Sequence, residues 1–424
     1  MTSMPAPCVQ QSFCIQPTAK DLCVPTPDVS PKTDNATVLA LFGKNKELVS
    51  LPVVENGRPF GLINRHIFLS QMSRPFYREL YDKKSCIAFM DKNPLIIEAS
   101  ASLNNVAAQT VVTGDKTLTD GFIITKNGRY IGIGLGIDLI KAVSAMHVQQ
   151  HQQIMQSIEY ARVIQEAMLT TSRQAMSCSL ADWCLTWEPR DCVGGDFYYF
   201  KTYPHGWLAA IADCTGHGVP GAFMTLIFAS ALEQALTQHG PETPALLLQA
   251  INQHIKNTLG QRDGKHHAST SNDGCDAIVM FCDVTENSLV WANARMAAFR
   301  IGQHSGQISV LDTDRMGIGY TDTPYDYQWP DYQLTLNNGD LMFTATDGLT
   351  DQIGGERRIM YGKRNLQEFL LRHQTQPMRA LASQLLHEHQ AYQGNQIRRD
   401  DLTFWGFRFS SARLNQVKRD HVRD

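Results

Sequence analysis

The stretch ADCTGHGVP, residues 212–220, ends an apolar run and places an Asp, a Cys, a Thr and a His within five residues. Three of these side chains can carry chemistry. Cys214 could act as a nucleophile, His217 as a general base and Asp213 as a metal ligand. The alternative is a tight turn, because Gly216 and Gly218 relieve backbone strain and allow close approach. The rest of the chain has to decide between these interpretations.

Composition sets broad limits on the protein class. The 424 residues predict two or three domains. A net charge of −3 favours neither a nucleic-acid partner nor an anionic membrane. No uncharged apolar run is long enough for a membrane span, and the N-terminus does not resemble a secretory signal. The 10 cysteines form no CxxC pair, so we predict reduced thiols in a cytoplasmic protein.

The N-terminal third divides into a tail and a repeat. Residues 1–36, rich in Pro, Thr, Ser and Gln, predict a flexible tail. Residues 37–145 contain two similar segments, centred on Asn56-Gly57-Arg58 and Asn127-Gly128-Arg129. Asn-Gly between apolar runs indicates a β-hairpin, and in each copy an amphipathic helix is expected to follow.

This repeat resembles a tandem cystathionine-β-synthase (CBS) domain pair. The resemblance implies a regulatory or sensor domain of the α/β class that binds a nucleotide or another small ligand between the copies. A packing or dimerisation module is the alternative.

A long helix is predicted over residues 140–176. Its apolar positions recur at steps of three and four: Ile154, Ile158, Ala161, Ile164 and Met168. Such a helix between two domains can pair with its copy as a coiled coil, giving a homodimer. The alternative is that it packs on the following domain.

Residues 177–410 are predicted to form the largest domain, followed by a solvated tail at 411–424. Short strand-like runs alternate with turns, and helices are expected near 220–238, 244–259, 365–373 and 377–390. Strands and helices are segregated, which indicates an α+β fold with mainly antiparallel sheets. The polar segment 261–274, with His266 and His267, predicts a loop whose histidines are solvated.

Four aspartates stand at predicted strand ends or turns: Asp196 in VGGDFYYF, Asp213 in ADCTGHGVPGAF, Asp347 in TATDGLTDQ and Asp400 in RRDDLTFW. Several converging buried carboxylates require a cation. Oxygen ligands without an organised Cys/His set favour Mg²⁺ or Mn²⁺ over Zn²⁺. Two such ions can activate water and stabilise a phosphoryl oxyanion.

In this order and spacing, the four motifs resemble those of PPM-type serine/threonine phosphatases, most similarly the SpoIIE branch. The resemblance covers about 230 residues and extends to the preceding helix, SIEYARVIQEAML. It implies an α/β/β/α sandwich with two divalent cations between antiparallel sheets. It further implies direct hydrolysis of phosphoserine or phosphothreonine by a metal-bound water, without a phosphoenzyme.

The resemblance assigns roles to individual residues. Asp213 would bridge both cations, beside the backbone carbonyl of Cys214. Asp196 would hold one ion largely through water, and Asp347 and Asp400 would complete the other site. Asp401 is expected to support these ligands, and Asp351 is a further candidate near the substrate. The segment NARMAAFRIG, residues 293–302, departs from the family pattern of Ala-Gly-His and Pro, which puts substrate-side details in doubt.

Other polar residues receive narrower interpretations. Cys214 as a phosphate-attacking thiolate would need a C-x₅-R loop, but residue 220 is Pro. His217 could be a general acid, although a helix-start position fits it better. Arg190 could meet a substrate phosphate or lie on the surface. Trp187, Trp207 and Trp405 are expected in or beside the core.

Together these features predict a metal-dependent bacterial protein phosphatase acting on a switch protein, such as an anti-sigma-factor antagonist, under control of the N-terminal domain. Two rival hypotheses are a non-catalytic scaffold that retains the metals and a hydrolase of small phosphate esters or nucleotides.

Overall fold

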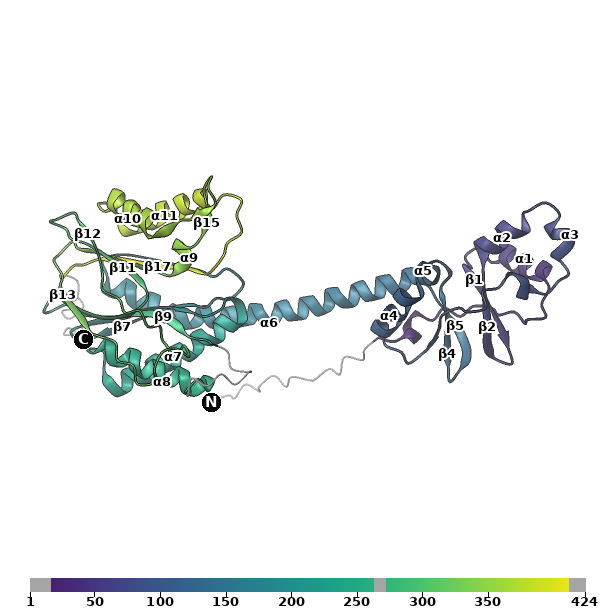
Figure 1. The fold of residues 1–424 in the computed structure, drawn as a ribbon, viewed down its shortest axis with the longest axis horizontal. Coiled ribbons are helices and arrows are strands. Elements are labelled where there is room, and N and C mark those ends of the chain that lie inside the picture. The colour runs from purple at the N-terminus through teal and green to yellow at the C-terminus, as the bar shows by residue number, and fades with distance from the viewer. Residues whose placement is uncertain (1–16, 263–271, 412–424) are drawn as a thin grey trace, which may run out of the picture. The chain divides into compact units, whose positions relative to one another are not determined.

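The computed structural model describes residues 17–262 and 272–411, which form two compact units, Met1–Ile154 and Met155–Asp424 (Figure 1). The segments 1–16, 263–271 and 412–424 lie outside the described residues. The predicted histidines 266 and 267 and almost all of the predicted C-terminal tail fall there.

The first unit contains two copies of one chain order, a strand-like segment, a helix, a hairpin and a second helix. The first copy holds α1 (Asn35–Lys44), β1 (Ser50–Glu55), β2 (Arg58–Asn64) and α2 (Arg65–Met72), followed by α3 (Tyr77–Tyr81) and the 3₁₀ turn η2 (Cys86–Phe89). The second holds β3 (Ile96–Glu98), α4 (Leu103–Thr113), α5 (Asp115–Asp120), β4 (Phe122–Lys126) and β5 (Arg129–Gly134). This order agrees with the predicted repeat.

Both predicted hairpins are confirmed. Strands β1 and β2 pair antiparallel, as do β4 and β5. Asn56 and Gly57 have φ of 52° and 78°, and Asn127 and Gly128 have 54° and 73°. Two successive left-handed residues make the turn whose twist matches paired strands, and Asn-Gly adopts it most readily.

The predicted N-terminal tail is wrong from residue 17 onward. Residues 19–22 form the 3₁₀ turn η1 (Ala19–Leu22), and Val24 and Val29 pair with Ile133 and Val53. Ala19 and Val29 are buried. Composition suggested disorder, but these few apolar side chains fill the edge of the repeat.

Helix α6 (Gly136–Ser179) is longer than predicted and contains the whole 140–176 segment. It begins in the first unit and ends in the second. Leu169 and Met176 are buried in the core of the second unit. Of the two alternatives for this helix, packing on the following domain therefore holds for its C-terminal part, while Ile154, Ile164 and Met168 remain exposed.

Two antiparallel five-stranded sheets form the centre of the second unit. One has the order β13-β10-β9-β8-β7 and the other β12-β11-β14-β17-β6. Their strands are β6 (Asp182–Glu188), β7 (Asp196–Tyr203), β8 (Gly206–Cys214), β9 (Cys275–Asp283), β10 (Ser288–Ala294), β11 (Ala297–Ile301), β12 (Ile308–Val310), β13 (Tyr332–Thr335), β14 (Leu341–Ala345) and β17 (Leu402–Arg408). A small hairpin adds β15 (Ile353–Gly354) and β16 (Ile359–Met360).

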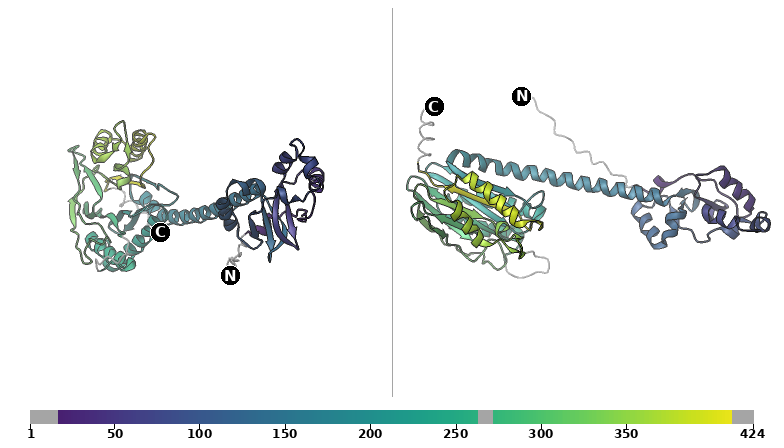
Figure 2. Two further views of the ribbon diagram at one scale, coloured as in Figure 1. Left: turned by 45° about the vertical axis from the view of Figure 1, so that its right-hand side comes forward. Right: turned by 90° about the horizontal axis from the view of Figure 1, so that it is seen from above.

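Helices cover the outer faces of both sheets. Helices α7 (Gly218–His239) and α8 (Pro244–Leu259) lie on one side, and α10 (Gly362–His373) and α11 (Met378–Gln393) on the other (Figures 1 and 2). The short α9 (Asp347–Thr350) follows β14. Trp207 and Trp405, from opposite sheets, meet edge to face with ring centroids 5.8 Å apart. The predicted α+β fold and its α/β/β/α sandwich are confirmed.

Among the described residues, α7 alone is long and apolar enough by composition to cross a membrane. Half of its most apolar window is buried. Phe228 and Leu232, which have no exposed surface, belong to the same core cluster as strands β7 and β8. A core helix of this kind passes the same test, so it is weak evidence for a span.

Candidate active site

Neighbouring strand ends bring the four predicted aspartates together at one end of the sandwich. Asp196 is the first residue of β7 and lies directly opposite Asp213, near the end of β8. Asp347 begins α9 immediately after β14, and Asp400 precedes β17, the strand paired with β14. The backbone N–H of Asp347 donates to the Asp213 carboxylate at 3.4 Å. The two sheets therefore each contribute two carboxylates.

The electrostatics are those of a cluster of like negative charges. Burial raises the pKa of Asp196 well above its usual range, and the charges of Asp401 and Asp400 raise it further. Burial also raises the pKa of Asp213, with added repulsion from Asp196, Asp347 and Asp400. Desolvation and the charge of Asp400 raise the pKa of Asp347. Such a set binds protons or cations readily.

Glycines allow the strand ends to approach this closely. A Cβ on Gly195 would lie 2.7 Å from the carbonyl oxygen of Cys214 and would also strike the carbonyl of Gly216. A Cβ on Gly194 would lie 2.9 Å from the Asp401 carboxylate. Both glycines of the VGGD motif are thus required by packing.

Asp401 accepts hydrogen bonds from the loop that precedes Asp196. Its Oδ2 accepts the Gly195 N–H at 2.6 Å, and its Oδ1 accepts the Arg190 N–H at 2.6 Å. The side chain is buried. The carboxylate therefore ties the β6–β7 loop to the start of β17, which agrees with the supporting role expected for it.

The remaining residues of the opening motif occupy turn and cap positions. Cys214 is buried, and its Sγ lies 2.9 Å from the Sγ of Cys275, so the thiol faces the core. His217 is the N-cap residue of α7, and its Nδ1 lies 2.7 Å from Asp191 Oδ2. Gly216 and Gly218 have φ of 84° and 65°. The turn interpretation of these glycines and of His217 is confirmed.

Arg190 and Asp351 lie at the edges of the cluster. The Arg190 Nη1 donates to the backbone carbonyl of Arg399 at 3.1 Å, and Nε lies 3.8 Å from Asp191 Oδ2. The Asp351 N–H donates to the carbonyl of Asp347, and Asp351 Oδ1 accepts from the Thr350 hydroxyl. Of the two, Asp351 lies on the same turn as a principal aspartate.

Sequence reasoning missed three residues that shape the site. The Thr346 hydroxyl donates to Asp196 Oδ2 at 2.9 Å across the two sheets. Gln165 of α6 is buried, donates from Nε2 to the Gly194 carbonyl at 2.8 Å and accepts the Gly194 N–H at 3.2 Å. Asp276 on β9 lies directly opposite Asp213. Thr346 stands within the quoted motif, whereas a polar Gln on an expected helix face carries no local signal.

The residues fit divalent cations. Within residues 17–262 and 272–411, no three His, Cys, Asp or Glu side chains enclose a metal ion by themselves. The four carboxylates and the Cys214 carbonyl oxygen, which lies close to Gly195, are nevertheless the oxygen ligands that hard divalent cations prefer. Mg²⁺ and similar hard ions commonly take one or two carboxylates and complete their shell with water.

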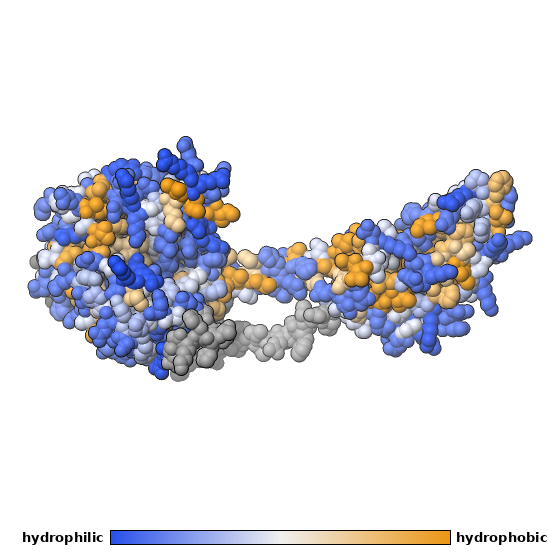
Figure 3. All heavy atoms as spheres, viewed as in Figure 1, coloured by the Kyte–Doolittle hydropathy of each residue, from blue (hydrophilic) through white to orange (hydrophobic). Residues whose placement is uncertain are grey.

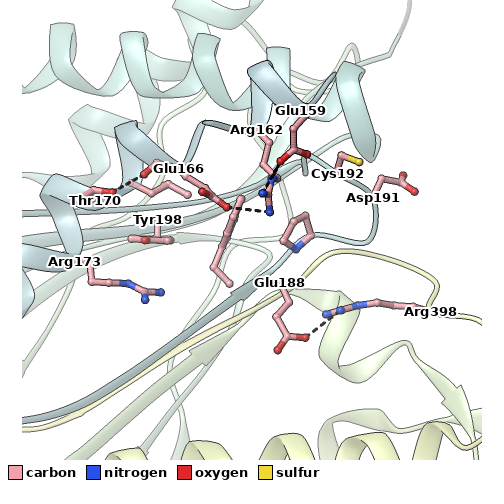
Figure 4. A pocket seen from close by; sticks show the side chains of 13 residues that line it. Glu159, Arg162, Glu166, Thr170, Arg173, Glu188, Asp191, Cys192, Tyr198 and Arg398 are labelled. Carbon is pink, nitrogen blue, oxygen red and sulfur yellow. Dashed lines mark hydrogen bonds and ion pairs between the residues drawn. The ribbon is translucent and has the colours of Figure 1, made fainter. Parts of the chain in front are cut away.

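A groove of about 610 Å³ lies beside this site, between α6 and the β6–β7 loop (Figure 4). It contains none of the four aspartates. Its wall includes three arginines: Arg162 and Arg398 are paired with Glu159 and Glu188, and Arg173 lies near Tyr198. Asp191, the partner of His217, lines its rim. The groove therefore lies between the C-terminal half of α6 and the sandwich.

Comparison with known proteins agrees with the geometry. Residues 203–410 match the family model of stage II sporulation protein E (SpoIIE). The chain resembles the SiaA-PP2C domain of Pseudomonas aeruginosa at 32% identity, covering 62% of this chain and 99% of that one, with a TM-score of 0.55.

Two more distant structures are also similar. One is a SpoIIE fragment of Bacillus subtilis with its PP2C domain, at 18% identity over 54% of this chain and 61% of that one, with a TM-score of 0.42. The other is the catalytic domain of phosphatase PstP in complex with two manganese ions, at 13% identity over 53% and 96%, with a TM-score of 0.39.

A search of curated proteins gave no match. The expected family is nonetheless confirmed by the SpoIIE match and by the 32% identity over 99% of the SiaA-PP2C domain. The chain therefore belongs to the SpoIIE family of metal-dependent PP2C serine/threonine protein phosphatases.

Proposed function

We propose that this phosphatase acts in bacterial signalling and removes phosphate from serine or threonine of a switch protein, such as an anti-sigma-factor antagonist. The observation that carries the proposal is the meeting of Asp196, Asp213, Asp347 and Asp400 at one end of the sandwich. A phosphoprotein surface can reach this end, because Asp347 is exposed and the turn after Asp213 is open to solvent.

Two divalent cations, Mn²⁺ or Mg²⁺, are the proposed cofactors. Asp213 would contact both, with the Cys214 carbonyl and Asp196 on one side and Asp347 and Asp400 on the other. When bound, such ions activate water for attack on phosphorus and offset charge on the phosphoryl oxygens. Both metals prefer octahedral oxygen sites, so the donor set does not select between them.

The chain's own residues orient this set. The Thr346 hydroxyl orients the Asp196 carboxylate, since it donates to Oδ2. Asp401 holds the Gly195 amide, which places the VGGD loop against the Cys214 carbonyl. The site carboxylates must be ionised to bind cations, so protons compete with the metals.

We further propose that the N-terminal domain regulates the enzyme through α6. Gln165 links that helix to Gly194 and, at 3.2 Å, to the Thr225 hydroxyl of α7. A shift of α6 would therefore displace the VGGD loop. A nucleotide or another small ligand at the CBS-like repeat is the proposed input, and deletion of residues 1–145 should change activity, oligomeric state or ligand response.

A homodimer through α6 is the proposed assembly, in the cytoplasm. Apolar side chains remain exposed along the helix before it packs on the sandwich (Figure 3). They include Val148, Ile154, Val163 and Ile164, with exposed fractions of 55%, 59%, 53% and 44%. Burial of such a stripe against a second copy would remove apolar surface from water.

One assay separates the proposal from its two rivals. Full-length protein with Mn²⁺, and with EDTA as a control, is tested on a phosphothreonine peptide, on a phosphorylated switch protein encoded nearby and on a nucleotide. Mn²⁺-dependent release from the proteins, lost in Asp213→Ala, is the expected result. No release from any substrate would favour the scaffold, and preference for the nucleotide would favour the small-ester hydrolase.

A further inference from the structure

An arginine stands at the same end of the sandwich as the acidic cluster. Arg295 lies in the turn between β10 and β11, where the chain passes from one sheet to the other. The last residue of β10, Ala294, pairs with Ala277 of β9, which in turn pairs with Ala212 of β8. Arg295 therefore follows β10 at the level where β8 reaches Asp213.

The backbone holds Arg295 in an unusual conformation. Its φ is 67°, the left-handed region that residues other than glycine seldom adopt. Its N–H donates to the Asp314 carbonyl at 3.1 Å, and Nε donates to the Arg315 carbonyl at 2.7 Å. The guanidinium carbon lies 5.1 Å from the centre of the Tyr320 ring. These contacts fix the position of the Arg295 side chain although its backbone is strained.

Each terminal amino group of the guanidinium lies within ion-pair distance of a carboxylate without donating a hydrogen bond to it. Nη1 lies 3.7 Å from Asp276 Oδ1, and Nη2 lies 3.9 Å from Asp322 Oδ2. Both separations exceed hydrogen-bond length. In the part of the chain that the structure describes, the one side-chain hydrogen bond of Arg295 is made by Nε. Two terminal amino groups in a planar fork are thus available to a ligand.

Asp276, which lies 3.7 Å from this fork, connects it to the cluster. Asp276 is directly opposite Asp213 on the adjacent strand, and neighbouring strands are about 4.8 Å apart. Its Oδ1 is buried and accepts no hydrogen bond from the described residues. The arginine thus faces an acidic wall that would repel a phosphate dianion, and it supplies a positive charge at that wall. Arg190, the sequence candidate, has its Nη1 occupied by the Arg399 carbonyl.

We propose that Arg295 binds the phosphate oxygens of the phosphoserine or phosphothreonine substrate, through its two terminal amino groups. The inference rests on the proposed phosphatase function and deepens it. A guanidinium matches two phosphoryl oxygens bidentately, which a lysine cannot do. Arg295 also lies in the segment 293–302 that departs from the family pattern. Arg295 would therefore give the chain a phosphate clamp of its own.

The test compares Arg295→Gln, Arg295→Lys and Arg295→Gly in the full-length protein saturated with Mn²⁺. Glycine adopts the left-handed backbone without strain, so a loss of activity in Arg295→Gly cannot come from backbone strain. Arg358→Gln is the matched control, because Arg358 is also left-handed, with φ of 50°, and lies in the exposed β15–β16 turn. Rates are measured on a phosphothreonine peptide, with inorganic phosphate as a product inhibitor.

We expect Gln and Gly to lower kcat/KM by roughly 10- to 100-fold, mainly through KM, and to weaken inhibition by inorganic phosphate similarly. Lys should recover part of the loss, and the midpoint of Mn²⁺ activation should stay within about twofold. Unchanged KM and phosphate inhibition in the Gln variant would overturn the proposal. The proposal would also be overturned if the Gln variant lost activity through weaker Mn²⁺ activation and if the double variant Arg295→Gln/Asp276→Asn regained it. A wild-type protein without Mn²⁺-dependent activity would instead refute the proposed function.

Discussion

Asp196 and Asp213 are directly opposite residues on the neighbouring antiparallel strands β7 and β8. Side chains of such a pair point to the same face of the sheet, so two carboxylates share one small volume. Burial and mutual repulsion raise the pKa of Asp213. Strand pairing therefore creates the centre of the acidic cluster, and a cation is the natural means of stabilising it.

Asp213→Asn should abolish metal-dependent activity while the fold persists. We expect kcat/KM to fall by more than about 100-fold, because changes to residues that only support a ligand already cost 10- to 100-fold. Without added metal, thermal stability should stay equal or rise, since one repelled carboxylate is removed. Phosphopeptide hydrolysis and a thermal melt check both. Activity within tenfold of wild type would contradict the assigned role.

Stabilisation by Mn²⁺ should grow with pH. The pKa values of Asp196 and Asp213 are raised in the fold, so without a cation their contribution to stability is lost as the pH rises above their ordinary range. A bound cation needs these groups ionised. The rise in Tm on adding Mn²⁺ should therefore be larger at pH 7.5 than at pH 5.5. Asp213→Asn should flatten the difference, and an equal rise at both pH values would argue against the site.

Gln165→Ala should reduce activity although the residue is on α6 and not in the cluster. Its amide pairs with both backbone groups of Gly194, and loss leaves them buried without a partner. We expect a destabilisation of about 1–3 kcal/mol and a lower kcat. Gln174→Ala, at an exposed position of the same helix, is the control and should change neither. Equal behaviour of the two variants would exclude the proposed coupling.

Cys214→Ala should keep most of the activity. The thiol is buried against Cys275, and only the backbone carbonyl of Cys214 faces the site. A small cavity should cost about 1 kcal/mol of stability. Steady-state kinetics on the phosphopeptide test whether the Cys214 thiol takes part in catalysis. An enzyme with a catalytic thiolate would be inactive after this change.

Asp340→Asn should lower the free energy of unfolding at neutral pH. It should also reduce the loss of stability that the protein shows as the pH falls. Asp340 is buried and accepts from the backbone of Gln303 and Asn337 and from the Arg300 guanidinium. Despite burial, these donors hold its pKa below the usual range. Its contribution is present above its unfolded pKa of about 3.9 and is lost as pH falls through the lower folded value.

We expect Asp340→Asn to cost about 2–3 kcal/mol at pH 7 and less below pH 3. Urea unfolding at the two pH values measures this. Arg364→Gln, which breaks an exposed pair with Glu368 on α10, should cost less than about 0.5 kcal/mol and serves as the control. A loss for Asp340→Asn that does not depend on pH would contradict the linkage.

Local chemistry was enough to predict the two Asn-Gly hairpins, because that dipeptide adopts the required left-handed turn wherever it stands between apolar runs. The apolar periodicity likewise predicted α6, and the ordered motifs, through the family they resemble, predicted the sandwich and its four aspartates. Composition failed for residues 17–36, since a few buried side chains such as Ala19 and Val29 outweigh a polar, proline-rich average.

Where the side chains of ADCTGHGVP lie was decided only by the tertiary structure. The stretch alone offered Asp213, Cys214 and His217 equally. Strand register placed Asp196 and Asp276 opposite Asp213, the core received the Cys214 thiol, and His217 became a helix cap. Gln165, Asp276 and Arg295 were found only through strand pairing and packing, because contacts between residues tens of positions apart leave no pattern in any short window of sequence.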